Sequence, residues 1–290
     1  DVLLPEGISG FGLELDPRFV DSLQLITGAL PAQYGFRTAG IVDIRTKNGA
    51  VENGGAVDLY GGANNTFRQS FEYGGTQGKL TCFIDGSHDH NDLGIENVTS
   101  SRNAIHDTTD QERFFGSFSY LIDATSRVNL MLSASYSDFE VPNTPGLPVG
   151  TAPGGDAWNT TYGQASFDSS SLDENQKEQN DYAVATYQKT LENLNCQVSV
   201  FGRKSGVHFT PDQTGDLYFN GVASDVRRTL YSGGLQGDAS YSLGNFHTLR
   251  WGASFLDEQV SSDSTTTVFN LDGAGNPVGA PYAIADHNTL

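Results

Sequence analysis

Basic residues are scarce in this sequence. Against 35 Asp and Glu there are only 16 Lys and Arg, which gives a formal net charge of −19 over 290 residues. A nucleic-acid-binding protein needs clustered Lys and Arg, and a helix lying on an anionic membrane surface needs a basic face. The charge balance therefore argues against both classes, and no nucleic-acid partner is predicted.

Long apolar runs are also missing, since nothing approaches the ~20 consecutive apolar residues of a membrane-spanning helix. This excludes helical spans but not a membrane β-barrel, whose polar lumen and loops dilute the lipid-facing signal. The only two cysteines, Cys82 and Cys196, lie far apart in the sequence. We interpret them as small apolar side chains on strands, with a disulfide in an oxidising compartment as the alternative.

Catalytic and metal-binding motifs are absent: there is no G-x-S-x-G, P-loop, H-E-x-x-H or paired C-x-x-C. The sequence thus predicts neither an enzyme nor a cofactor. In the cluster His88–Asp92 only His88 and His90 could share one face of a strand, so a solvated rim is the simpler interpretation and no metal site is predicted. The run Asp272–Pro277 suggests a calcium loop but lacks a bidentate acid, which favours a plain turn.

What the sequence does contain is alternation of apolar and polar residues with a period of two from Gly54 onward, the signature of β-strands. Nine strands are predicted: Gly55–Gly62, Thr66–Gly74, Lys79–His88, Glu112–Ile122, Arg127–Ser137, Tyr182–Leu191, Asn195–Arg203, Thr229–Ser242 and His247–Leu256. On the outer face of the sheet we expect Leu130, Leu132, Trp251 and Phe255. On the inner face we expect Ser133, Ser135 and Arg250.

The connections between these strands alternate in length. Short ones are expected at Gly75–Gly78, Asp123–Ser126, Glu192–Leu194 and Leu243–Phe246, and long polar ones at Asn91–Gln111, Glu140–Asn180, His208–Arg228 and from Ser261 onward. The opening connection, Gly62–Asn65, is a short exception. Such asymmetry is typical of an outer-membrane barrel, in which short turns face the periplasm and long loops face outside.

Tyrosines support the same interpretation, because one lies near a short turn on each of four strands: Tyr73, Tyr120, Tyr187 and Tyr241. Aromatic rings with a polar tip gather at a membrane interface, although cross-strand packing could explain each one alone. The inner faces also carry charges such as Arg68, Glu72 and Asp238. Those charges need water or a polar plug, which indicates a wide barrel of which this chain holds only a part.

The segment Phe19–Lys47 resembles the C-terminal stretch of the plug domain of TonB-dependent receptors. In that family a strand leads to a glycine-containing loop, a Tyr-Gly pair, and a further glycine followed by an alternating Val/Ile strand. The matching positions here are Gly28, Pro31, Tyr34, Gly35 and Gly40. One departure is that the family often has Arg-Gly-Pro where this chain has Thr-Gly-Ala, with the proline delayed. The segment covers about a tenth of the chain and precedes barrel-like hairpins.

The resemblance implies an all-β fold: an antiparallel transmembrane β-barrel of about 22 strands in which about nine belong to this chain, preceded by the end of a small α+β plug domain. Residues 1–50 would be the plug part and residues 51–290 the first part of the barrel. The implied function is TonB-dependent import of a scarce ligand, of the ferric siderophore, cobalamin or oligosaccharide class, across the outer membrane of a Gram-negative bacterium.

The implied partners are outer-membrane lipid, the ligand, and a TonB complex that contacts a segment upstream of Asp1. We expect the signal peptide and that contact segment to precede this chain. A passive porin or an adhesin barrel is the alternative, and it would need no plug segment. A secreted all-β binding module is disfavoured by the asymmetric loops, and a barrel enzyme has no catalytic residues to support it.

Overall fold

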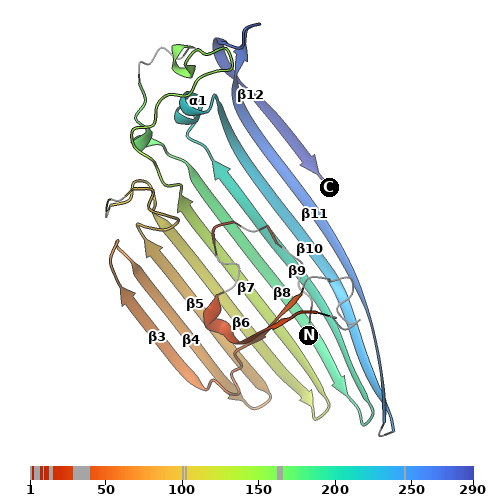
Figure 1. The fold of residues 1–290 in the computed structure, drawn as a ribbon. Coiled ribbons are helices and arrows are strands. Elements are labelled where there is room, and N and C mark those ends of the chain that lie inside the picture. The colour runs from red at the N-terminus through yellow and green to blue at the C-terminus, as the bar shows by residue number, and fades with distance from the viewer. Residues whose placement is uncertain are drawn as a thin grey trace.

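A computed structural model describes residues 2, 7–8, 10–12, 16–28, 40–99, 101, 103–161, 166–244 and 246–290. Ten strands form one antiparallel sheet, and each pairs with the next along the chain (Figure 1). They are β3 (Gly54–Gly61), β4 (Phe67–Gln77), β5 (Leu80–Asn91), β6 (Thr109–Asp123), β7 (Ser126–Glu140), β8 (Asn175–Thr190), β9 (Leu194–Thr210), β10 (Val222–Leu243), β11 (His247–Leu271) and β12 (Pro277–Thr289). The predicted all-β antiparallel fold is confirmed.

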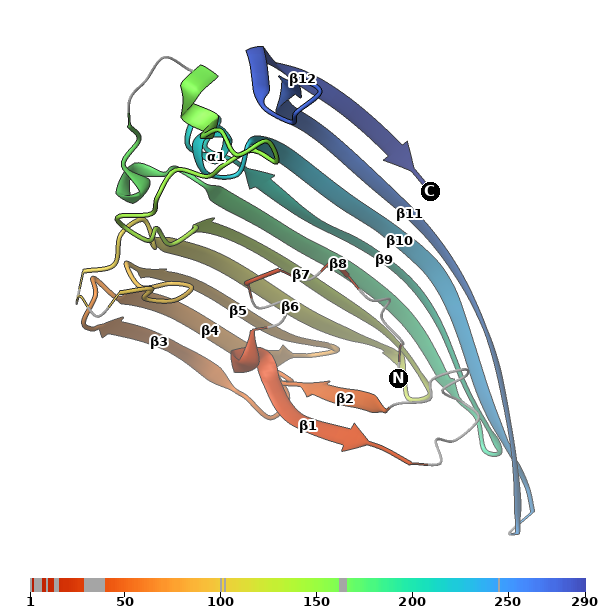
Figure 2. The same ribbon diagram turned by 45° about the horizontal axis from the view of Figure 1, so that its top comes forward.

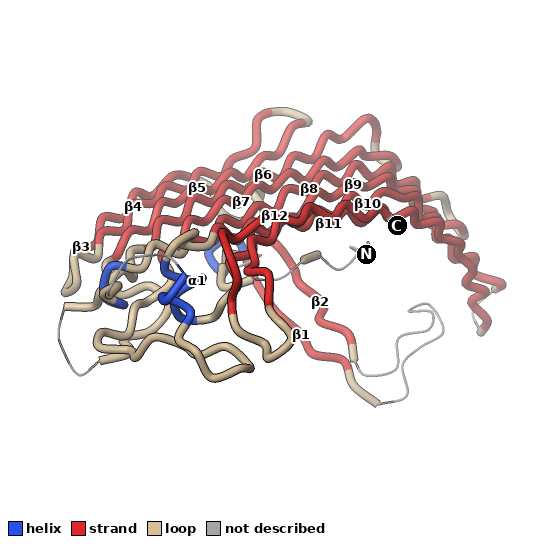
Figure 3. Tube along the Cα trace, turned by 90° about the horizontal axis from the view of Figure 1, so that it is seen from above, coloured by secondary structure: helices blue, strands red, loops and turns tan. Residues whose placement is uncertain are grey.

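A second, two-stranded sheet lies on one side of the ten-stranded sheet, which we call the wall. It consists of β1 (Val20–Ile26) and β2 (Ile41–Thr46), preceded by the short 3-10 helix η1 (Pro17–Phe19). Viewed along the wall, the large sheet is curved, and β1, β2 and the helical loops lie on the same side of it (Figures 2 and 3). We call this side the inner face.

The tenth strand, β12, was not predicted, and the long loop expected from Ser261 onward is wrong. The Ser- and Thr-rich run after Ser261 lacks apolar alternation, yet its backbone pairs with both β10 and β12. Strand β12 begins at a proline and contains Gly279 at a φ of 76°, and these two residues interrupt the alternation of apolar and polar residues. The true connection is a turn at residues 272–276, in which the Asp272 carboxylate accepts from the backbone N–H groups of Ala274 and Asn276, each at 2.9 Å.

The predicted division into two faces is confirmed. Leu130 is 37%, Trp251 52% and Phe255 64% exposed on the outer face. Ser133, which faces inward, is buried, and cross-strand register places it beside Phe115 and Tyr182. Cys82 and Cys196 are both unpaired, as expected for cysteines on strands.

The four predicted short turns lie at one end of the wall and the long loops at the other, as predicted, although two short connections, 62–66 and 272–276, also lie at the long-loop end. Turns at residues 78–79, 124–125, 191–193 and 244–246 lie at one end, and the four tyrosines near them are all exposed: Tyr73, Tyr120, Tyr187 and Tyr241. At the other end, residues 62–66, 92–108, 141–174, 211–221 and 272–276 connect the strands (Figure 1). Among the described residues no helix is long and apolar enough to cross a membrane.

The long connections are folded rather than extended. Residues 141–174 contain the 3-10 helices η3 (Trp158–Thr161) and η4 (Ser169–Ser171), and residues 211–221 contain the helix α1 (Gly215–Phe219). Leu217, Ala223 and Phe269 form a buried cluster to which Trp158 adds a ring stacked on Phe269 at 5.7 Å between centroids. The loops therefore share a small apolar core with the adjoining ends of β10 and β11.

Candidate functional site

The segment from Asp16 onward meets the inner face of the wall at a buried cluster of charged residues. Asp16 caps η1 by accepting from the backbone N–H of Arg18 at 2.9 Å, and it also accepts from the Ser87 hydroxyl of β5 at 2.8 Å. Burial alone would raise the pKa of Asp16, but these hydrogen bonds outweigh it and hold the pKa below its usual range. The carboxylate is therefore charged while it is buried.

Two guanidinium groups compensate this charge: Arg18 donates to Asp16 Oδ2 at 3.3 Å, and Arg113 of β6 approaches the same oxygen from the wall. The Arg113 guanidinium lies 3.8 Å from Asp16 Oδ2 and donates to Asp89 of β5 at 2.7 Å. Nε of Arg68 in β4 forms an ion pair with the other oxygen of Asp89 at 2.8 Å. The Arg113 side chain is only 8% exposed, so this pairing takes place away from solvent, where an ion pair is strongly directional and costly to break.

An aromatic cluster adjoins these charges. Phe19, at the end of η1, stacks on Phe115 of β6 with 4.1 Å between ring centroids and 15° between planes. Phe83 of β5 completes the cluster, and all three rings are at most 2% exposed. Lys47, just after β2, donates to Glu72 of β4 at 2.7 Å, so the end of the small sheet is also tied to the wall.

The aromatic cluster was not predicted from the sequence, although the pattern of the strands contained an indication of it. Phe83 and Phe115 are large apolar side chains at inward-facing positions of strands whose inner face is otherwise polar, between Thr81 and Asp85 and between Arg113 and Ser117. Such a break in the alternation indicates that something apolar packs on the inner face. Their partner Phe19 could not be deduced, because it is far away in the sequence.

Farther toward the long loops, the start of the chain contacts β8 and β9. Backbone N–H groups of Phe11 and Gly12 donate to the Glu178 carboxylate at 2.6 and 2.9 Å, and that of Ile8 donates to the Ser205 hydroxyl at 2.9 Å. Hence the described residues before β3 contact six neighbouring strands, β4 to β9, and their contacts extend well beyond the buried cluster.

The predicted plug-motif residues are only partly described. Gly28, at a φ of 94°, follows β1, and this positive φ favours glycine over residues with a Cβ. Gly40 directly precedes β2. The other three, Pro31, Tyr34 and Gly35, lie outside the described residues, so the role of the motif stays a prediction.

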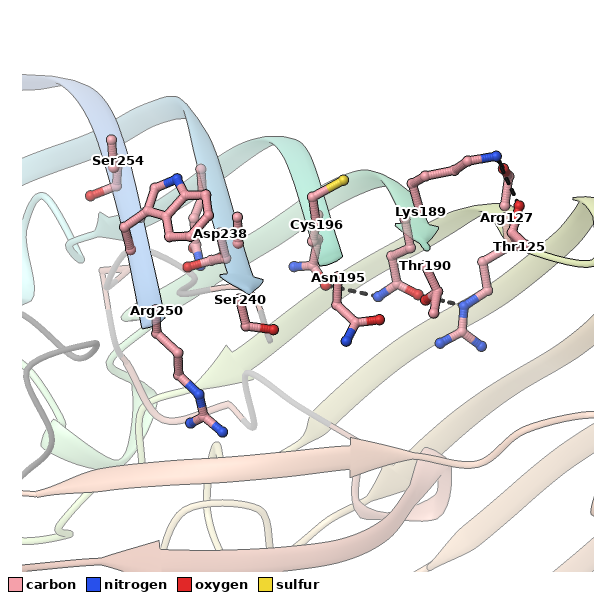
Figure 4. Close-up of a pocket in the computed structure, with 18 of the residues that line it drawn as sticks. Thr125, Arg127, Lys189, Thr190, Asn195, Cys196, Asp238, Ser240, Arg250 and Ser254 are labelled. Carbon is pink, nitrogen blue, oxygen red and sulfur yellow. Dashed lines mark hydrogen bonds between the residues drawn. The ribbon is translucent and has the colours of Figure 1, made fainter. Parts of the chain in front are cut away.

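A cavity of about 1090 Å3 opens along β7 to β11 near the short turns. Its inward wall carries a run of amides and charges in which Arg127 donates to Gln188, and Gln188 donates to Gln197 at 2.8 Å. Arg127 and Arg250 point to the side on which the small sheet lies, whereas Lys189 and Cys196 point away from it (Figure 4). A polar solute could be hydrogen-bonded along this wall.

His88 and His90 lie on the outer face of β5, as the alternation predicts, and both approach Asp110 Oδ1, at 3.5 and 2.8 Å. Within the described part of the chain, no group of three or more His, Cys, Asp and Glu side chains could hold a metal ion.

Taken together, a curved antiparallel wall with an exposed apolar outer face, and a small sheet fixed to its polar inner face, define part of a plugged membrane β-barrel. No family model and no curated protein matches the sequence.

Solved structures do match. The siderophore receptor PiuA from Acinetobacter baumannii is 13% identical with a TM-score of 0.57, covering 94% of this chain and 44% of that one. The ferripyoverdine receptor of Pseudomonas aeruginosa is 14% identical with a TM-score of 0.59, covering 94% and 38%. The FrpB iron transporter of Neisseria meningitidis is 10% identical with a TM-score of 0.57, covering 95% and 49%.

At these identities the matches establish the fold, and the resemblance to TonB-dependent receptors read from Phe19–Lys47 is confirmed at that level. The chain spans less than half of the length of each of these three structures.

Proposed function

We propose that this chain is the end of the plug, residues 1–50, and the first part of the barrel, residues 51–290, of a TonB-dependent transporter in a Gram-negative outer membrane. The transporter imports a scarce ligand of the ferric siderophore, cobalamin or oligosaccharide class. The three matched structures are named as siderophore receptors or as an iron transporter, which favours an iron chelate among these ligands.

The observation that carries the proposal is the small sheet held on the inner face of the wall. A passive pore has no need of a segment whose Phe19 and Asp16 are both buried against its lumen. A plug held by an aromatic stack and by charged hydrogen bonds conducts nothing until work is done on it. The energised inner-membrane TonB complex would supply that work from the periplasmic end.

The ligand would dock first at the end of the wall formed by the long loops. These connections gather at one end of the strands, opposite the short turns, and in an outer-membrane barrel that end faces outside. From there the ligand would pass the plug and leave along the polar wall that includes Gln188 and Gln197.

The test is uptake by cells that carry the full-length protein, with candidate radiolabelled ferric siderophores, cobalamin and oligosaccharides as probes. Uptake of one probe is expected in a strain with TonB and not in a strain without it. Uptake that persists undiminished without TonB would overturn the proposal.

A passive porin or adhesin is the alternative, and conductance in planar bilayers separates it from the transporter. The intact protein is expected to stay closed, whereas a porin would show steady open-channel current. Removal of the buried charge in Arg113→Ala should produce intermittent openings, because Asp16 then loses its charged partner on the barrel wall and keeps only Arg18 of its own segment. The matched control is Arg227→Ala, whose side chain lies on the outer face beside His208.

A further inference from the structure

Asp85 of β5 is a buried carboxyl group that lies under the plug segment, by which we mean the described residues before β3. It is 1% exposed, and neither of its oxygens has a hydrogen-bond partner among the described residues. The inner-face residues around it each contact the plug segment: Glu72, Ser87 and Phe115. The segment therefore covers Asp85 without satisfying it.

Burial of this kind is costly, because a carboxylate that loses its hydration needs donors in place of the water. The plug segment brings two cations to this region, but both are engaged by other carboxylates. Arg18 donates to Asp16 at 3.3 Å, and Lys47 donates to Glu72 at 2.7 Å. A proton on Asp85 would not complete a hydrogen bond either, since no acceptor among the described residues is in position to receive it.

Arg113 of β6 lies midway between Asp85 and the next inner-face aspartate of β5, Asp89. It pairs across the strands with Ser87, and the two aspartates lie two residues to either side of Ser87. Diagonal neighbours on one face of a sheet are within reach of a long side chain. The guanidinium is turned to Asp89, at 2.7 Å, and to Asp16 of the plug segment, at 3.8 Å. Its Nε is buried and has no acceptor among the described residues.

An acceptor without a donor and a donor without an acceptor thus occupy diagonal positions on the inner face of the wall. The plug segment accounts for their separation, because Asp16 accepts from Ser87 and attracts the guanidinium from that position. Asp89 does not depend on Arg113 alone, since Arg68 of β4 pairs with its other oxygen at 2.8 Å. The guanidinium can therefore turn away from Asp89 and leave that carboxylate paired.

We propose that Arg113 exchanges Asp16 for Asp85 when the plug segment leaves the wall. In the docked state the guanidinium contacts Asp16 and Asp89, and Asp85 is unpaired. In the released state Asp16 has gone, water reaches the inner face, and the guanidinium pairs with Asp85. The exchange lowers the free energy of the released state, because the charge that the segment leaves behind finds a new partner on the wall. It rests on the proposed function only in requiring that the segment can leave.

The test is a double-mutant cycle on undocking of the full-length protein in liposomes at neutral pH. Phe19→Cys places a thiol that the wall covers until the segment undocks, and every other cysteine, Cys82 and Cys196 included, is replaced by Ser. The rate at which a methanethiosulfonate reagent modifies this thiol reports the undocked population. Asp85→Asn and Arg113→Gln are introduced singly and together.

Asp85→Asn is expected to slow modification whether or not Arg113 is present, because the docked state then no longer buries an unpaired carboxylate. With Arg113 present the slowing should be greater by about two- to fivefold, which is the effect of a charge pair that water reaches. The additional slowing arises because the guanidinium loses its partner in the released state. Since the two side chains form no hydrogen bond or ion pair in the docked state, the difference reports their contact in the released state.

Asp58→Asn is the matched control, because Asp58 also lies on the inner face, in β3 opposite Ser70, but is exposed. It should change the rate little in either background. Arg113→Met, which keeps a long side chain without the charge, repeats the comparison if Arg113→Gln fails to assemble. Equal slowing by Asp85→Asn in the two backgrounds, greater slowing without Arg113, or faster modification in Asp85→Asn would overturn the exchange.

The measurement uses neither ligand nor TonB. Failure of the exchange would therefore leave TonB-dependent uptake standing. Failure of the uptake experiment would leave the exchange standing as a property of the contact between the plug segment and the wall.

Discussion

Truncation of Phe19 to alanine should release the plug segment from the wall. Phe19 is 2% exposed and stacks on Phe115, so Phe19→Ala removes a fully buried ring and leaves a cavity between η1 and the wall. Substitutions of this kind cost about 3–5 kcal/mol. Since about 1.4 kcal/mol corresponds to a factor of ten, the undocked population should rise by roughly two to three and a half orders of magnitude.

The assay is single-channel conductance of the full-length protein in planar bilayers, where undocking appears as transient openings. Phe11→Ala is the matched control, because Phe11 is 53% exposed and touches Phe139 only edge-on, with 5.7 Å between ring centroids. That substitution should change the open fraction little. If Phe11→Ala and Phe19→Ala open the protein equally often, the buried stack is not what holds the segment and the reasoning fails.

Three other outcomes are expected. Leu132→Arg puts a charge on the outer face and should destabilise the folded barrel by ~2–4 kcal/mol if the position lies near the bilayer midplane, whereas Ser254→Arg, exposed on the inner face, should cost far less in reversible unfolding from liposomes. Asp85→Asn should raise the denaturant midpoint, because Asp85 is 1% exposed and neither of its carboxylate oxygens has a partner among the described residues; an unchanged or lower midpoint would count against this. The isolated chain should aggregate in detergent rather than give the heat-modifiable gel migration of a closed barrel, because β3 and β12 end its sheet without a further strand.

Alternation along single strands was enough to predict which side chains lie on the outer face of the sheet. Leu130 and Trp251 are outside and Arg250 is inside because a period of two fixes the face once one residue is assigned. The same reasoning failed after Ser261, where the residues are serines and threonines and no apolar residue recurs at every second position. There the strand exists because its neighbours offer hydrogen bonds on both sides, which is a property of the sheet and not of the segment.

The site could be predicted only in outline. A plug segment was expected from Phe19–Lys47, but its contacts join residues far apart in the chain, such as Asp16 with Ser87, 71 positions later. Each of these side chains looks ordinary in its own segment, since a serine on an inner face or an aspartate before a proline has many explanations. That such residues contact one another follows only from the pairing of the strands, which places Ser87 beside Arg113.

The contacts of the plug segment combine opposite charges with an apolar stack. Asp16 lies 3.8 Å from the Arg113 guanidinium, and Phe19 stacks on Phe115 beside them. Separating the segment from the wall would break a buried charge contact and expose apolar rings in the same step, so the two parts of the contact reinforce each other.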